Sequence, residues 1–177
     1  MSYIDSLDGA VVCFFNYGTG TCIDLTEGKP STPFRLASSN SLCKAIRPTP
    51  LPSLGTSTTL VKTSIGHFIE SIIAPFGPHD WADLAVANMD LLNGGKADGT
   101  KINGYSGPAT NNTNLHQLWR LVSADPAGRV IMIQNVGTGT YVDLLNGNSA
   151  NSTQISSYSG NVEAKNEHQL WRVLRIE

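Results

Sequence analysis

The pentapeptide His-Gln-Leu-Trp-Arg occurs at residues 116–120 and again at residues 168–172. Each copy closes a segment that opens with Asp-Leu-Leu-Asn-Gly, at residues 90–94 and 143–147. A recurrence of this length indicates an internal duplication, and a repeated unit constrains the architecture more firmly than local propensity does.

The two segments also agree between these landmarks. Tyr-Ser-Gly follows the opening at the same distance in both, at residues 105–107 and 158–160. The one difference in length falls in the polar stretch that comes next, residues 108–114 against 161–166. Because insertions and deletions accumulate in exposed loops, we expect this stretch to lie on the surface.

A third, degraded copy lies upstream. Asn-Tyr-Gly-Thr-Gly-Thr-Cys-Ile-Asp-Leu at residues 16–25 aligns with Asn-Val-Gly-Thr-Gly-Thr-Tyr-Val-Asp-Leu at residues 135–144. This copy lacks the later signatures, because the position that corresponds to Tyr105 falls near Ala37 and no Gln-x-Trp follows.

We therefore expect one domain, residues 1–177, built from three repeats. The repeats are placed at about residues 10–63, 64–123 and 124–177. In the first repeat, residues 59–62 are expected to form the strand that residues 118–121 form in the second, which leaves residues 38–57 as an inserted loop.

Short alternating segments separated by Gly, Asn, Ser and Thr run through the repeats, as at residues 130–133, 140–143 and 170–174. This pattern is typical of an all-β fold. Three sheet-forming units that cannot each bury a core are expected to close into one barrel with threefold pseudosymmetry, with Trp119 and Trp171 in the shared core.

Composition narrows the functional class. The 177 residues are 40% hydrophobic and carry 12 basic and 14 acidic side chains, a formal charge of −2, with no basic patch that would suggest nucleic acid as a partner. The first residues do not resemble a secretory signal, and no segment has the length of a membrane span. The three cysteines are odd in number and confined to the first repeat, which fits reduced thiols in a cytoplasmic protein.

Catalytic and metal-binding patterns are weak. No Gly-x-Ser-x-Gly, phosphate-cradling loop or recurring pair of carboxylates is present, so we do not expect an enzyme or a cofactor. His67, His79 and Asp83 are too scattered to propose as a metal site.

The Asp-Leu opening, the Ile-x-x-Tyr middle and the Gln-x-Trp close together resemble the ricin-type β-trefoil lectins. The form Asn-x-His-Gln-x-Trp, at residues 114–119 and 166–171, is similar to that of mushroom members of the family. The resemblance is strongest over residues 87–177 and thin between residues 38 and 83. It implies a β-trefoil, a barrel of three repeats capped by hairpins. It also implies a fungal, cytoplasmic, defence-related lectin that binds galactose-type or N-acetylgalactosamine-type glycans on glycoproteins or glycolipids, and a homodimer would add to its sites.

The residues themselves support sugar binding. An aromatic ring can cover the C–H face of galactose, a carboxylate can accept two hydroxyl hydrogens at once, and Asn and His can add donors. The candidate binding residues are Asp90, Asn103, Gly104, Tyr105, Asn114, His116 and Gln117 in the second repeat, and Asp143, Ser156, Tyr158, Asn166, His168 and Gln169 in the third. The first repeat lacks this set, so two sites are expected.

Each residue type also has a structural interpretation. The Trp and Gln of Gln-x-Trp fit a core residue and a residue that fixes loop geometry, and the tyrosines could be ordinary exposed aromatics. His116 and His168 could satisfy backbone groups. Asp90 and Asp143 could form turns, since Asp24 holds the same position in the repeat that lacks the set. The combination of Asp, Tyr, Asn and His favours binding.

A protease inhibitor is the alternative hypothesis. The inserted loop carries Lys44 and Arg47, either of which could enter the specificity pocket of a trypsin-like protease. Pro48 and Pro50 would stiffen that loop and reduce the entropy lost on docking. Two intact copies of a sugar-binding set favour the lectin.

Overall fold

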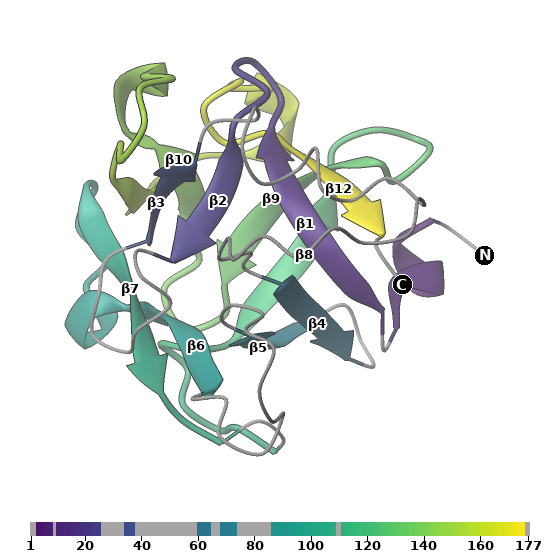
Figure 1. Cartoon of the computed structure of the whole chain (residues 1–177). Coiled ribbons are helices and arrows are strands. Elements are labelled where there is room, and N and C mark those ends of the chain that lie inside the picture. Colours follow the sequence, from purple (N-terminus) through teal and green to yellow (C-terminus); the bar gives the residue numbers. More distant parts are fainter. Residues whose placement is uncertain are drawn as a thin grey trace, which may run out of the picture.

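The computed structural model of the protein describes residues 3–8, 10–25, 34–37, 60–64, 68–73, 86–108 and 111–175. These ranges form twelve β-strands and four short 3-10 helices (Figure 1). The all-β class expected from the sequence is therefore confirmed. No helix in these ranges is long and apolar enough to cross a membrane.

The strands fall into three groups of four that follow the chain. The first group is β1 (Val11–Asn16), β2 (Cys22–Leu25), β3 (Phe34–Ala37) and β4 (Leu60–Ser64). The second is β5 (Phe68–Ile73), β6 (Val86–Leu91), β7 (Thr100–Ser106) and β8 (Trp119–Ser123). The third is β9 (Val130–Asn135), β10 (Tyr141–Leu144), β11 (Ile155–Tyr158) and β12 (Trp171–Arg175). The helices are η1 (Ile4–Leu7), η5 (Leu92–Gly94), η6 (Leu145–Gly147) and η7 (Val162–Ala164).

The first and last strands of each group close a barrel. Strand β4 pairs with β1 and β5, β8 pairs with β5 and β9, and β12 pairs with β9 and β1, always antiparallel. Strand β4 thus takes the place that β8 and β12 take in the other groups. The strand expected at residues 59–62 is present, and the expected inserted loop, residues 38–57, lies outside the described residues.

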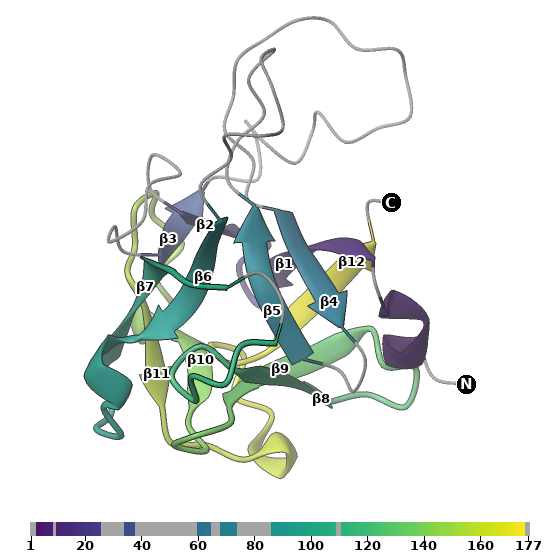
Figure 2. The same cartoon turned by 90° about the horizontal axis from the view of Figure 1, so that it is seen from below.

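The inner strands of each group form hairpins beside the barrel (Figure 2). Strands β2 and β3, β6 and β7, and β10 and β11 pair in this way, and β11 also pairs with β7 of the preceding group. Consecutive hairpins therefore contact each other across the boundary between repeats.

The core follows from the strand alternation. In β8, Trp119 and Leu121 are buried while Arg120 between them is exposed, because successive side chains in a strand point to opposite faces. Strand β12 repeats this pattern around Trp171. Both indoles are fully buried in one cluster that Ile4 and Leu7 of η1 also join. Truncation of a buried Trp to Ala typically costs about 3–5 kcal/mol, so this pair is a large part of what holds the barrel together.

Candidate functional site

The Gln-x-Trp motif of the second repeat ties its loop to strand β6. Gln117 Nε2 donates a hydrogen bond to Asp90 Oδ2 at 2.9 Å, and Trp119 Nε1 donates to the carbonyl oxygen of Met89 at 2.7 Å. Gln117 lies in the turn before β8 and Trp119 is the first residue of that strand, and the two side chains bond to neighbouring residues of β6. The motif therefore fixes the position of the Asp90 carboxylate.

The third repeat builds the same connection. Trp171 Nε1 donates to the carbonyl oxygen of Val142 at 3.1 Å, and Gln169 hydrogen-bonds to the Asp143 carboxylate. Burial raises the pKa of the Asp143 carboxyl, while the hydrogen bond from Gln169 and the charge of His168 act in the opposite direction. The two aspartates are nearly buried, with exposed fractions of 9% for Asp90 and 4% for Asp143.

The two repeats differ in how the glutamine is held. In the second repeat, Gln117 Oε1 accepts hydrogen bonds from Asn88 Nδ2 at 3.1 Å and Asn112 Nδ2 at 2.7 Å. In the third, Gln169 Nε2 donates to the Ser159 carbonyl oxygen at 3.1 Å. Within the described residues, the buried Gln169 Oε1 has no hydrogen-bond partner. The glutamine that bonds to the aspartate is thus held by different groups in the two repeats.

The turn after each aspartate brings a histidine close. Asn93 and Gly94 have φ of 52° and 62°, and Asn146 and Gly147 have 55° and 62°, which is the left-handed region that Asn and Gly tolerate best. A Cβ at either glycine would overlap the imidazole of His116 or His168 respectively. The repeated glycine therefore leaves the space that the histidine ring fills.

The asparagine before each histidine caps the loop. Asn114 Oδ1 accepts a hydrogen bond from the His116 backbone N–H at 3.1 Å, and Asn166 Oδ1 accepts one from the His168 N–H at 3.1 Å. Both asparagines are exposed and both histidines are half-buried. The side-chain oxygen of each asparagine therefore stabilises the loop that carries the histidine.

Each histidine loop is also held by a side chain from another repeat, which the sequence reasoning missed. Asn135, at the end of β9, donates through Nδ2 to the carbonyl oxygens of Leu115, His116 and Leu118 at 3.1, 3.2 and 3.4 Å. Asn16, at the end of β1, donates to those of Glu167, His168 and Leu170 at 3.0, 3.3 and 3.3 Å. The repeated Asn-x-Gly-Thr-Gly-Thr was the signal in the sequence for this role.

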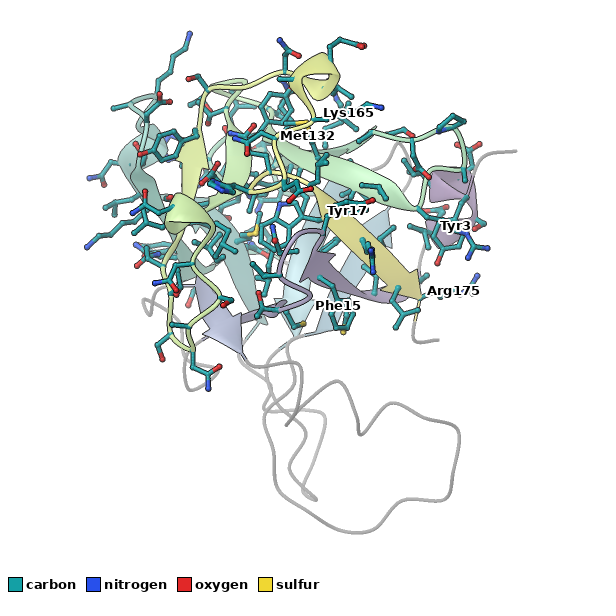
Figure 3. All side chains as sticks on the ribbon, turned by 90° about the horizontal axis from the view of Figure 1, so that it is seen from above. Tyr3, Phe15, Tyr17, Met132, Lys165 and Arg175 are labelled. Atoms are coloured by element: carbon teal, nitrogen blue, oxygen red, sulfur yellow. The ribbon has the colours of Figure 1, made fainter. Side chains whose placement is uncertain are left out.

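The turn of the first repeat therefore supports the candidate site of the third. The next residue, Tyr17, strengthens this contact, because its ring lies beside β12 with the Arg172 guanidinium carbon 4.8 Å from the ring centroid (Figure 3). Cation–π contacts at exposed positions contribute about 0.5–1 kcal/mol.

The tyrosines lie on the same hairpin face as the aspartates. Tyr105 pairs with Asn88 in the β6–β7 register, two positions from the pair of Asp90 with Asn103. Tyr158 pairs with Tyr141 in the β10–β11 register, again two positions from Asp143. Positions two apart share a face of a strand. Tyr105 is 55% exposed, whereas Tyr158 is half-buried.

Two other candidates are placed less favourably. Gly104 pairs with Met89, so it belongs to the opposite face of the hairpin and is buried. Ser156 pairs with Asp143 and shares its face of the hairpin, but it is 1% exposed and its Oγ has no partner among the described residues. Asn103, the counterpart of Ser156, is half-buried. Gln117 and Gln169 are buried, with exposed fractions of 3% and 1%. Each hydrogen-bonds to the aspartate carboxylate of its own repeat.

The first repeat has the strand geometry without the aromatic ring. Its hairpin pairs Asp24 with Arg35 and Cys22 with Ala37. Ala37 thus occupies the register position that Tyr158 has opposite Tyr141, as the alignment of the repeats predicts.

Comparison with solved structures identifies the architecture. The chain superposes on a designed threefold-symmetric protein, ThreeFoil, with a TM-score of 0.66 over 94% of this chain and 99% of that one, at 16% sequence identity. The protein is a β-trefoil. Residues 108–177 of this β-trefoil match the family model described as ricin-type beta-trefoil lectin domain-like. No curated protein sequence matches the chain significantly.

Two natural lectins have the same fold. The structure of a Macrolepiota procera ricin B-like lectin in complex with lactose matches with a TM-score of 0.50 and 18% identity, over 95% of this chain and 96% of that one. A Polyporus squamosus lectin bound to Neu5Acα2-6Galβ1-4GlcNAc matches with a TM-score of 0.59 and 18% identity, over 95% of this chain. The β-trefoil spans about half of that second lectin, 49% of its chain.

The described side chains hold no arrangement for a metal ion, since no group of three or more His, Cys, Asp and Glu with suitable placement occurs among them. His67, His79 and Asp83 lie outside the described residues. What the site offers is a fixed carboxylate, an aromatic ring on the same face and an imidazole beside the intervening turn, in two copies.

Proposed function

We propose that this β-trefoil is a non-catalytic lectin that binds galactose-type or N-acetylgalactosamine-type glycans through the sites of its second and third repeats. The observation that carries the proposal is the recurrence of one geometry: an Asp fixed by Gln-x-Trp, a Tyr on the same hairpin face and a His against the turn glycine.

The chemistry of the site fits a neutral sugar. The carboxylate is already oriented by the glutamine, so it can accept ligand hydroxyl hydrogens with little loss of side-chain entropy. The exposed ring of Tyr105 offers an apolar surface to the C–H face of the sugar. The lactose complex of the Macrolepiota procera lectin supports a galactoside as the first ligand to test.

Each site is expected to bind weakly, with a dissociation constant of about 1 mM, or about −4 kcal/mol. Two sites on one chain can engage two glycans at once, and such multivalency raises the strength of attachment without new contacts. A cytoplasmic location and a defence role, which the family resemblance implies, belong to the proposal as well.

The decisive experiment removes the aromatic surfaces one at a time. Tyr105→Ala and Tyr158→Ala are each expected to lower the number of lactose molecules bound per chain from two to one, and the double variant to abolish binding. Isothermal titration calorimetry measures both, and circular dichroism checks that each variant is folded. Undiminished binding by the folded double variant would refute the proposal.

The inhibitor hypothesis rests on Lys44, Arg47 and the rest of residues 38–57, which lie outside the described residues. No described contact favours it. A trypsin inhibition assay of the wild-type chain, with Lys44→Ala and Arg47→Ala as controls, tests it directly.

A further inference from the structure

A turn of the second repeat lies against the candidate site of the third. The backbone N–H of Gly99 donates to the Ser157 carbonyl oxygen at 2.8 Å, and the following residue, Thr100, pairs with Ser157 between β7 and β11. A Cβ added at Gly99 would stand 3.7 Å from the hydroxyl oxygen of Tyr158. This turn therefore borders the aromatic ring proposed to stack on the sugar.

The same turn places a carboxylate beside that ring. Asp98 Oδ1 accepts a hydrogen bond from the Ser159 backbone N–H at 2.6 Å, and Oδ2 accepts one from Ser159 Oγ at 2.9 Å. Ser159 directly follows Tyr158 in the chain. Each carboxylate oxygen has two lone pairs, so each retains one acceptor position after these bonds. Asp98 is exposed, and its carboxylate is thus held in a fixed orientation with acceptor capacity left for a ligand.

The charge of Asp98 acts on the buried Asp143 carboxyl group. Burial is the main cause of the raised pKa of Asp143, and the negative charge of Asp98 raises it further. The two carboxylates come from different repeats and act on the same region.

The second and third repeats differ at this position of the turn. In the alignment of the repeats, the residue of the third repeat that corresponds to Asp98 is Asn151, which is neutral. Tyr158 is half-buried where Tyr105 is 55% exposed, so the two rings differ in surroundings as well.

We propose that Asp98 is a specificity-determining residue of the third-repeat site, supplied by the second repeat. It accepts a hydroxyl hydrogen from a neutral galactoside and repels a glycan whose galactose carries an anionic substituent, such as the carboxylate of a sialic acid. The inference rests on the proposed function, because it assigns ligand selectivity to one of the two proposed sites.

The test isolates the third site with Tyr105→Ala and then adds Asp98→Asn. Asn keeps an oxygen that can accept the Ser159 N–H, so the turn is expected to fold. We expect the preference for lactose over 6′-sialyllactose to shrink about fivefold on the substitution at low ionic strength, and less in added salt, since screening weakens interactions between exposed charges. Titration calorimetry of both sugars at two salt concentrations gives the ratio.

Asp8→Asn in the same Tyr105→Ala background is the matched control. It makes the same change in net charge at an exposed residue next to η1, which lies on the opposite side of the molecule from η5 and the turn that follows it (Figure 1). An unchanged sugar ratio in Asp98→Asn, or an equal change in Asp8→Asn, would overturn the inference and leave the proposed function standing. Absence of lactose binding by the wild-type chain would overturn the proposed function, and the inference with it.

Discussion

Gly94 and His116 illustrate how single residues shape the site. The glycine adopts φ of 62°, and the imidazole occupies the space where its side chain would be. Gly147 and His168 repeat the contact in the third repeat. The Asp-Leu-Leu-Asn-Gly motif and the His-Gln-Leu-Trp-Arg motif are thus complementary surfaces, which explains why the two sequences recur together.

Gly94→Ala is expected to disturb the second-repeat site. The left-handed conformation costs a non-glycine residue about 1–2 kcal/mol, and displacement of the His116 ring adds about 1–3 kcal/mol. Gly20→Ala is the matched control, because Gly20 has φ of 69° with no atom within 4 Å of the added Cβ. We expect both variants to lose stability in urea denaturation, and Gly94→Ala alone to lose one of two lactose sites. Equal effects of the two variants on binding would contradict this role of the histidine contact.

At the scale of the elements, each loop that carries a histidine depends on a strand end from another repeat. The β9 end serves the loop of the second repeat, and the β1 end serves the loop of the third, in each case through one asparagine amide that donates to three carbonyl oxygens. The same asparagines also organise their own turns, since Asn16 Oδ1 accepts the Thr19 N–H and Asn135 Oδ1 accepts the Thr138 N–H.

Asn16→Ala and Asn135→Ala should therefore impair different sites. Each variant removes the three side-chain hydrogen bonds that hold the loop, at a cost of about 0.5–1.5 kcal/mol per bond, while the histidine and leucine carbonyl oxygens next to the Gln-x-Trp motif keep backbone donors. We expect Asn16→Ala to weaken binding at the third repeat and Asn135→Ala at the second. Combining each with Tyr105→Ala or Tyr158→Ala assigns the loss by calorimetry, and ¹H–¹⁵N spectra show whether His116 or His168 has shifted. Loss of the same site in both variants would refute the assignment.

At the scale of the whole molecule, the barrel and its hairpins bury the Asp143 carboxyl group in surroundings that raise its pKa. Trp119 and Trp171 connect the core to the strand residues that precede Asp90 and Asp143, because their indole N–H groups donate to the backbone oxygens of Met89 and Val142. Binding residues that cost stability are common in proteins, because selection acts on function once stability is sufficient.

Asp143→Asn is expected to change how stability depends on pH. Since the pKa of Asp143 is raised in the folded protein, the folded state holds this proton more tightly than the unfolded state does. Its contribution to the free energy of unfolding is therefore fully present below the ordinary carboxyl pKa of about 3.9 and is lost as pH rises through the raised value. The variant lacks this loss, so its stability relative to wild type should increase as pH rises from about 3 to about 6. Urea denaturation followed by Trp fluorescence measures the difference, and a constant or falling difference would contradict the prediction.

Sequence alone determined the all-β class, the threefold barrel, the core position of Trp119 and Trp171, and the absence of an aromatic residue at Ala37. These features can be predicted from periodicity and repetition, because strand alternation and the spacing between motifs are properties of the sequence itself.

The tertiary structure alone decided which residues meet across repeats. Asn16 reaching the loop of His168, and Asp98 beside Tyr158, join residues far apart in the chain through barrel closure and hairpin pairing. Register likewise placed Gly104 on the opposite face from Asp90, although the sequence put it among the candidates. When the pairing register of a strand shifts by one residue, every side chain moves to the opposite face of the sheet. The direction of each side chain is therefore fixed only when the strands pair.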